Sequence, residues 1–144
     1  MIVKIPFLPW TSKAALEVDV PDNTEVQFRL RVAVEISVSK KAGLTGADLR
    51  GADLTGADLR GAGLGDKGKM VAPYILQIGP IGSRRDYLVA YFTDKGVWIK
   101  AGCFNDTLAA FEEAVEKTHG TTDHGKHYHA AIELIKAMAP KGQE

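Results

Sequence analysis

A glycine- and arginine-rich segment in the second half of the chain carries the residue types that bind anions. It spans residues 79–85 and reads Gly-Pro-Ile-Gly-Ser-Arg-Arg. The glycines leave backbone N–H groups free to converge on an anion, Ser83 adds a hydroxyl, and the forked donors of Arg84 and Arg85 match phosphate oxygens. The glycine spacing fits neither a Walker loop nor a dinucleotide fingerprint. We predict an anion site from Gly82 to Arg85; the alternative is an ordinary turn whose arginines are solvated or paired with Asp86.

The segment that follows adds aromatic residues next to the two arginines. Residues 87–92 and 97–101 flank a Thr-Asp-Lys-Gly turn and read as a β-hairpin. Tyr87, Trp98 and Lys100 lie on this hairpin, where an aromatic face can stack a nucleobase. We include these three residues in the predicted ligand-binding set. The alternative is that the aromatic face forms core beneath helices.

The distribution of charge points to the same region. The whole chain has 18 basic and 18 acidic residues, which argues against a general polyanion-binding protein and against a wholly acidic mimic of DNA. Residues 67–100 carry six basic and two acidic side chains, whereas the segments on either side are net negative. The middle segment is therefore where a small anion is expected to bind, and nucleic acid is not an expected partner.

Other candidate catalytic or metal-binding residues lack the necessary spacing. Four histidines lie within residues 119–129 without an HExxH or CxxC motif, so a zinc site built on His124 and His127 is only the alternative to a polar, pH-sensitive surface. Cys103 is the only cysteine, which excludes an intrachain disulfide and favours a reducing cytosol. Having no partner at a catalytic spacing, it is expected to be a half-buried structural thiol. We predict no catalytic residue, no metal and no cofactor.

Residues 42–66 repeat every five residues, as AGLTG ADLRG ADLTG ADLRG AGLGD. A period of five fits neither a helix nor a strand. The third position of each unit is a leucine that we expect to point inward as a repeat core: Leu44, Leu49, Leu54, Leu59 and Leu64. Glycines 46, 51, 56 and 61 are expected at tight corners with positive φ, and the Asp and Arg side chains are expected to face water.

This tract resembles the pentapeptide-repeat family, whose unit is Ala-(Asp/Asn)-Leu-x-x. The resemblance implies a short right-handed quadrilateral β-helix with four units per coil, and the 25 residues here make about one coil. A single coil cannot bury its leucines alone, so we expect the preceding segment, the C-terminal part or another subunit to cap it. The whole chain also resembles small phage or prophage pentapeptide-repeat proteins, which have a strand and an amphipathic segment before the repeat and an α/β module after it.

These elements predict an α+β fold in three parts, residues 1–41, 42–66 and 67–140, with residues 141–144 as a polar tail. Residues 14–20 read as a strand, and an Asp22–Glu25 capping box is expected to start a helix. Residues 24–40 alternate like a strand, but the resemblance favours a helix. After Met70, strands are followed by a helix that Asp106 or Thr107 caps and Gly120 ends, and by a second helix over about 123–138, which form a small β-sheet/two-helix module.

The sequence predicts a non-enzymatic protein that binds a small anionic ligand such as a nucleotide. The phage-type resemblance implies an accessory protein of a bacterial host's cytoplasm that sequesters a host immune signal as a counter-defence. Assembly into a dimer or higher homo-oligomer is expected, and the interrupted apolar N-terminus and the absence of a long apolar run predict no signal peptide and no membrane span. The alternatives are an inhibitor that binds a host protein through the repeat surface and a small hydrolase using His119 or His127.

Overall fold

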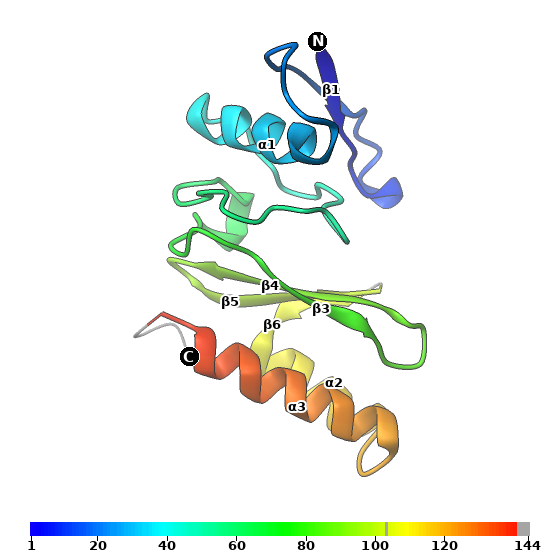
Figure 1. Ribbon diagram of the computed structural model, residues 1–144. Coiled ribbons are helices and arrows are strands. Elements are labelled where there is room, and N and C mark those ends of the chain that lie inside the picture. The colour runs from blue at the N-terminus through cyan, green and yellow to red at the C-terminus, as the bar shows by residue number, and fades with distance from the viewer. Residues whose placement is uncertain (103, 141–144) are drawn as a thin grey trace. The chain divides into compact units, whose positions relative to one another are not determined.

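The computed structural model describes residues 1–102 and 104–140, so Cys103 and the predicted polar tail at 141–144 lie outside the described residues. The chain divides into two compact units, Met1–Tyr74 and Ile75–Glu144. The described residues form an α+β structure with three α-helices and two sheets, and the α+β class is the predicted one (Figure 1). None of the described helices is long and apolar enough to cross a membrane. The three-part division into domains stays a prediction.

The first unit opens with a two-stranded antiparallel sheet followed by a helix. Strand β1 (Ile2–Ile5) pairs with β2 (Leu16–Asp19), which confirms the strand predicted within residues 14–20. Helix α1 (Arg29–Ser39) packs against both strands. Short 3-10 turns precede and follow these elements: Pro9–Thr11, Val26–Phe28 and Gly65–Lys67. The core of this part is the inner side of the sheet and of the helix, because Ile5 and Val34 are both 0% exposed.

Helix α1 settles the ambiguity in residues 24–40 in favour of a helix. Its buried residues are Ala33, Val34 and Ser37, which share one helical face rather than alternating as in a strand. The hydroxyl of Ser37 donates to the carbonyl of Ala33 at 2.9 Å, so even this buried polar group is satisfied inside the helix. The apolar alternation in the sequence was misleading because both the inner face and the half-buried flanks of α1 carry apolar side chains.

The predicted capping box is wrong. No side chain caps the start of the 3-10 turn at Glu25 or the start of α1 at Phe28. Asp22, the proposed cap, instead accepts a hydrogen bond from the α-amino group of Met1 at 2.7 Å. The carboxylate binds the amine because a full positive charge is a stronger hydrogen-bond partner than a backbone amide.

The repeat segment is a series of β-turns built by the same residue in each unit. The backbone carbonyl of each of the first four leucines accepts a hydrogen bond from the amide of the alanine three residues later, at 2.9–3.1 Å. The third residue of every turn is glycine with φ between 71° and 85°, as expected. These φ values match position i+2 of a type II turn, where a side chain is strained. The positive-φ glycines are Gly46, Gly51, Gly56 and Gly61.

The leucines are turned inward, with one exception. Four of them are at most 7% exposed: Leu44, Leu49, Leu59 and Leu64. The central Leu54 is only half-buried. The amide of Leu44 donates to the carbonyl of Gly63 at 3.2 Å, so the backbone returns beside its start after about four units.

The repeat does not contain the regular strands that the β-helix expectation implied. Within residues 42–66, all of which the structure describes, only isolated bridges form, joining Phe7 to Ala47 and Gly63 to Lys69. The physical reason is that each unit spends most of its five residues in a turn, which leaves segments too short for a ladder. The repeat segment is therefore a series of turns whose end lies near its start.

Other parts of the same unit pair with the repeat backbone. The early turns bond to the segment before α1, through Leu8 N to Gly46 O at 2.8 Å and Asp48 N to Pro6 O at 2.7 Å. The late turns bond to the segment that follows, through Gly61 N to Met70 O at 2.8 Å and Leu59 N to Pro73 O at 2.7 Å. Several backbone groups near both ends of the segment are thus hydrogen-bonded within the first unit.

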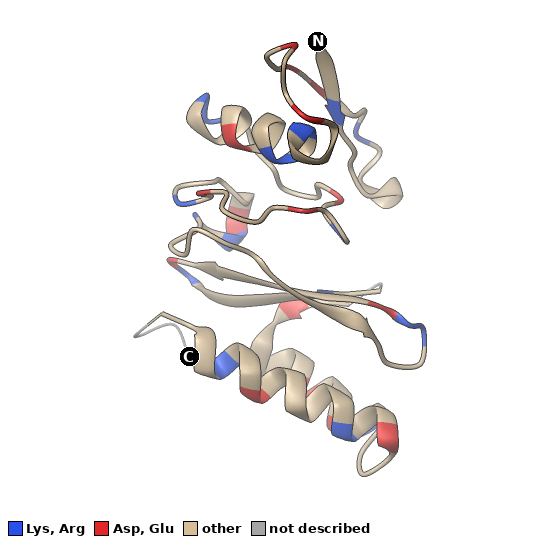
Figure 2. Ribbon diagram, in the orientation of Figure 1, with Lys and Arg blue, Asp and Glu red and all other residues tan. Residues whose placement is uncertain are grey.

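The aspartate side chains of the repeat accept hydrogen bonds from the backbone as well as facing water. In three units the Asp carboxylate accepts the amide two residues later: Asp48 from Arg50, Asp53 from Thr55 and Asp58 from Arg60. Ion pairs of 2.9 Å and 2.6 Å join the two Asp–Arg pairs, and Figure 2 shows both signs of charge along this segment. The hydrogen bond from Arg60 lowers the pKa of Asp58 to about 2. The exposed surface of the repeat is therefore locally neutralised.

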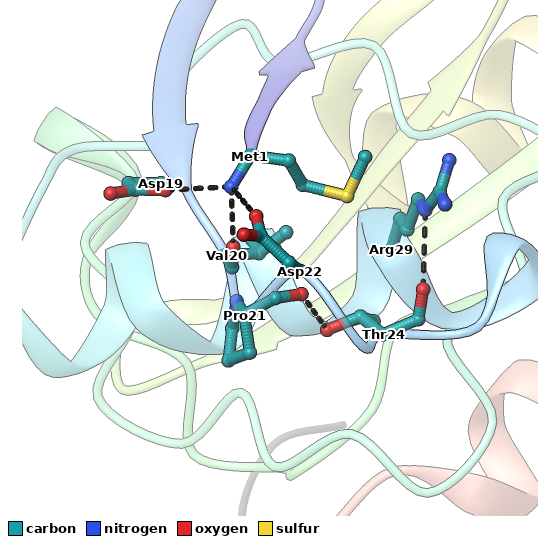
Figure 3. A network of polar contacts seen from close by, with 7 residues as sticks. All are labelled: Met1, Asp19, Val20, Pro21, Asp22, Thr24 and Arg29. Carbon is teal, nitrogen blue, oxygen red and sulfur yellow. Dashed lines mark hydrogen bonds and ion pairs between the residues drawn. The ribbon is translucent and has the colours of Figure 1, made fainter.

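A polar network holds the start of the chain against the end of β2 (Figure 3). The α-amino group of Met1 donates to Asp19 Oδ1 at 3.0 Å, to the Val20 carbonyl at 2.9 Å and to Asp22 Oδ1 at 2.7 Å. The hydrogen bonds to Asp22 and then Asp19 raise the pKa of the amine, and the amine lowers the pKa of Asp22. Arg29 Nε donates to the Thr24 carbonyl at 3.2 Å and so links this corner to the start of α1.

The second unit is a four-stranded antiparallel sheet with two helices on one face (Figure 1). The strands are β3 (Leu76–Ile81), β4 (Asp86–Thr93), β5 (Gly96–Ala101) and β6 (Phe104–Thr107), in that spatial order. The β4–β5 hairpin confirms the one predicted around Thr-Asp-Lys-Gly. Strand β6 was not predicted, because its four residues read as the lead-in to a helix.

The two helices begin at threonine caps. The hydroxyl of Thr107 accepts the amide of Ala110 at the start of α2 (Leu108–Thr118), and that of Thr122 accepts the amide of Gly125 at the start of α3 (Asp123–Met138). The bounds of α3 agree with the predicted ones, and α2 lies between Thr107, one of its two predicted caps, and the predicted stop at Gly120. Their apolar faces pack on the sheet, where the core consists of Leu88, Ala90, Phe92, Ile99, Phe111, Val115, Ile132 and Ile135, all at most 5% exposed.

Candidate ligand-binding site

The β3–β4 turn positions the predicted anion-binding residues. The amide of Arg85 donates to the carbonyl of Gly82 at 3.2 Å, and both residues have positive φ, at 49° and 78°. A side chain at Gly82 would overlap the hydroxyl of Tyr128 on α3, so this glycine permits the turn to pack against the helix. The turn carries basic residues next to an acidic one (Figure 2). Its tight geometry decides where each arginine points.

A cavity of about 320 Å³ lies beside this turn within the second unit. Its polar side includes Ser83, Arg84 and Tyr87 from the predicted set. The remaining walls come from β6 and from the inner faces of α2 and α3, with Phe104, Phe111, Val115, His119 and Tyr128. The structure therefore combines three predicted residues with an apolar and aromatic wall contributed by distant parts of the sequence.

The aromatic wall is a connected set of rings. The ring of Phe111 lies edge-on to Phe104, with centroids 5.2 Å apart, and edge-on to Tyr128 at 5.7 Å. His119 stands 5.3 Å from Tyr128. The sequence placed Phe111 and Tyr128 on the buried stripes of their helices, but it gave no signal that they would border a cavity. Phe104 was missed as a site residue because β6 itself was missed.

The electrostatics of the cavity are mixed. Arg84 is exposed, and within the described residues neither Arg84 nor Arg85 forms an ion pair, so the expected alternative of pairing with Asp86 is not realised. Asp86 lines the same cavity and accepts the amide of Tyr87 at 2.7 Å. The cavity thus presents one unpaired guanidinium to a bound group, with a carboxylate nearby that favours hydrogen-bond donors.

Four of the predicted residues lie elsewhere. Gly82 and Arg85 line a second, more open groove of about 640 Å³ beside α3. Trp98 and Lys100 line neither hollow; they share a face of β5, and Lys100 is 4% exposed. The ammonium of Lys100 donates to the carbonyl of Gly102. The predicted residues therefore lie partly at a cavity that contains Arg84, partly at a groove that contains Arg85 and partly at neither, and their role in binding stays a prediction.

The histidines separate into two groups. The rings of His119, His124 and His127 follow one another with centroids 5.9 Å and 6.3 Å apart. His129 is separate from them, and its Nε2 lies 2.7 Å from a carboxylate oxygen of Glu116. Among the residues described here, no three histidine, cysteine or acidic side chains are placed to hold a metal ion.

Comparison with known proteins identifies one segment of the chain. Residues 41–64 match the family model described as pentapeptide repeats (8 copies). No curated protein and no solved structure matches the chain significantly. The matched residues are those whose leucines are turned inward and whose glycines make the type II turns. Residues 41–64 thus belong to the pentapeptide-repeat family.

Proposed function

We propose that the second unit binds a small ligand that combines a ring with an anionic group, as a nucleotide does. The observation that carries this proposal is the cavity in which the unpaired Arg84 meets the aromatic wall of Phe104, Phe111 and Tyr128. A guanidinium binds phosphate through forked hydrogen bonds, and an aromatic wall binds a ring through stacking or edge contacts. Ser83 supplies a further hydroxyl at the same side of the cavity.

The size of the cavity favours a ligand with one ring system. Its volume of about 320 Å³ is at the lower end of small-molecule sites, which range from roughly 300 to 1,000 Å³. A mononucleotide or a cyclic mononucleotide suits this space better than a dinucleotide. Asp86 supports the same class, because a carboxylate accepts hydrogen bonds from sugar hydroxyls or from an exocyclic amine.

Binding without chemistry is the activity that these residues support best. Ser83 and His119 line one cavity, but within the described residues neither side chain makes a hydrogen bond, so the nucleophile–base contact of a hydrolase is missing. A protein that holds a nucleotide signal unchanged acts by sequestration. In the cytoplasm of a bacterial host, such sequestration is the counter-defence role that the phage-type resemblance implies.

The two arginines provide a matched test of this proposal. Thermal-shift titration with mono- and cyclic nucleotides is expected to raise the melting temperature of the wild type, because ligand binds only the folded state. Arg84→Ala is expected to weaken binding at least about tenfold, the loss of one charge-assisted contact. Arg85→Ala removes the same charge from the neighbouring groove and is expected to bind as the wild type does.

Two results would contradict the proposal. Equal loss of binding in both arginine variants would show that charge alone, and not the cavity, determines affinity. Recovery of a hydrolysed nucleotide after release from the wild type would favour the enzyme instead. The free nucleosides serve as the control for the anionic group, since they keep the ring and lack the phosphate.

For the repeat segment we propose a second function as a protein-binding surface on one coil of a right-handed quadrilateral β-helix. The near return of Leu44 to Gly63 and the type II turns support that coil. Its outward Asp58 and Arg60 form an ion pair with exposed side chains, so the surface carries both signs of charge and is ill suited to imitate DNA. Capture of one host protein in stoichiometric amount, lost on reversing Arg60 to Glu, is the outcome expected of this function.

A further inference from the structure

Helix α3 carries a second stripe of residues next to its buried one, on the side where the helix borders a groove shared with β3. Its inner stripe consists of Tyr128, Ile132 and Ile135, which pack in the second unit. The outer stripe consists of His127, Ala130, Leu134 and Met138, spaced at three or four residues and therefore on one face. All four are exposed, and Leu134 and Met138 are the two large apolar side chains on α3 that are exposed, at 45% and 37%.

Two opposite charges border this stripe on the same side. Lys126 and Glu133 are seven residues apart, about two helical turns, so both project from one flank of α3. Both are exposed, and within the described residues neither forms an ion pair. The next basic residue, Lys136, is instead paired with Glu112 of α2 at 2.8 Å. The flank thus presents one positive and one negative charge in a fixed order, and the charge of Glu133 also adds to the raised pKa of Lys136, whose main cause is Glu112.

We propose that this face of α3 binds α3 of a second copy of the chain, antiparallel, about a twofold axis at Ala130 and Ala131. In this pairing His127 of each copy faces Leu134 of the other. Lys126 lies nearly opposite Glu133 of the second copy, offset by about two residues or roughly 3 Å along the helix axis. Because of the twofold symmetry, the same ion pair forms twice. The alanines at the axis allow the two backbones to approach closely.

The charge order specifies the antiparallel arrangement. A parallel pair related by a twofold axis along the helices would place the two charged flanks on opposite sides of the interface, so neither ion pair would form. In the antiparallel pair, the positive end of each helix dipole also lies beside the negative end of the other, which is favourable. Both effects select one orientation of the second copy, whereas an unrelated apolar partner has no such constraint.

The groove beside α3 provides the rest of the contact surface. Its volume is about 640 Å³, and it is lined on the sheet side by Ile78, Pro80 and Ile81 and on the helix side by Ala131 and Leu134. Arg85, His124 and His127 also line it, and among the described residues no acidic side chain does. The apolar side chains in the outer stripe of a second α3 can pack on the apolar part of this lining. Because α3 has 16 residues and is about 24 Å long, the interface is small, and we expect a dimer that dissociates at concentrations on the order of micromolar.

Charge reversal tests the pairing with its own internal control. Analytical ultracentrifugation of the full chain is expected to show a monomer–dimer equilibrium. Lys126→Glu makes both interchain pairs Glu–Glu, and Glu133→Lys makes both Lys–Lys, so each single variant is expected to dimerise about tenfold more weakly. An equimolar mixture of the two variants restores two opposite-charge pairs. It is expected to form a heterodimer at least as tightly as the wild type forms its homodimer.

A change of charge away from the stripe is the matched control. Lys117→Glu makes the same reversal on the exposed side of α2 and is expected to leave the dimer unchanged. Leu134→Asp is expected to give a monomer whose circular dichroism matches the wild type. The proposal is overturned by a wild type that stays monomeric to millimolar concentration, by a dimer that survives Leu134→Asp, or by a mixture of the two reversed variants that does not associate.

Discussion

At the scale of single residues, side chains that are equivalent in the repeat differ in how deeply they are buried. The repeat places a leucine in every unit, and its period predicted that all five point inward. Leu59 is 2% exposed, whereas Leu54 in the preceding unit is only half-buried. The five-residue period cannot convey this difference, because it arises from which neighbouring segments cover each unit.

This difference predicts unequal costs of the same substitution. Leu59→Ala is expected to lower the free energy of unfolding by about 3 kcal/mol, through lost burial and a residual cavity. Leu54→Ala is expected to cost about 1 kcal/mol, because part of that side chain already meets water. Urea denaturation of the two variants measures both values. Equal losses would contradict the inward placement described for Leu59.

At the scale of elements, the turns of the repeat depend on backbone conformation more than on packing. Gly61 has φ of 85° and an open space where a Cβ would stand, and Gly63 has the same open space without positive φ. Comparing substitutions at the two glycines therefore measures the strain of a positive φ without steric overlap.

Gly61→Ala is expected to destabilise the chain by about 1 kcal/mol, the cost of a side chain in a left-handed conformation. Gly63→Ala is expected to be neutral or slightly stabilising, because alanine reduces the conformational freedom of the unfolded chain. Thermal unfolding of the two variants gives the comparison. A Gly63→Ala variant as unstable as Gly61→Ala would contradict the assignment of a type II turn to the repeat.

The elements also show how far the sequence could predict the fold and the site. Helices α2 and α3 and the β4–β5 hairpin were predicted because their signals are local: apolar stripes at helical spacing, a possible cap at Asp106 or Thr107, and a glycine turn. The Asp22 cap was wrong because a distant group, the α-amine of Met1, binds the same carboxylate. The cavity could be predicted only at Ser83, Arg84 and Tyr87, since its aromatic wall forms when helices distant in sequence pack beside the turn.

At the scale of the whole molecule, acidification is expected to act on the first unit. The pKa values of Asp22, Asp53 and Asp58 are all lowered, by hydrogen bonds from the α-amine, from Thr55 and from Arg60 respectively. A lowered pKa means that the folded state holds the carboxylate in its charged form. These groups therefore contribute stability above their ordinary pKa, near 4, and this stability is lost as the pH falls towards 2.

The two tryptophans allow this prediction to be measured, because Trp10 lies in the first unit and Trp98 in the second. In a Trp98→Phe background, the fluorescence of Trp10 is expected to report a loss of stability between pH 4 and pH 2. Adding Asp58→Asn is expected to reduce that pH dependence, since one titrating group is removed. An unchanged acid profile in the double variant would contradict the role assigned to the Asp58–Arg60 pair.

The placement of Arg84 and Arg85 at different hollows has a consequence for regulation. One hydrogen-bonded turn holds the first arginine at the proposed ligand cavity and the second at the proposed dimer groove. A ligand that shifts that turn is expected to shift the lining of the groove as well. Occupancy of the one hollow and self-association through the other would then be thermodynamically linked, equally in both directions.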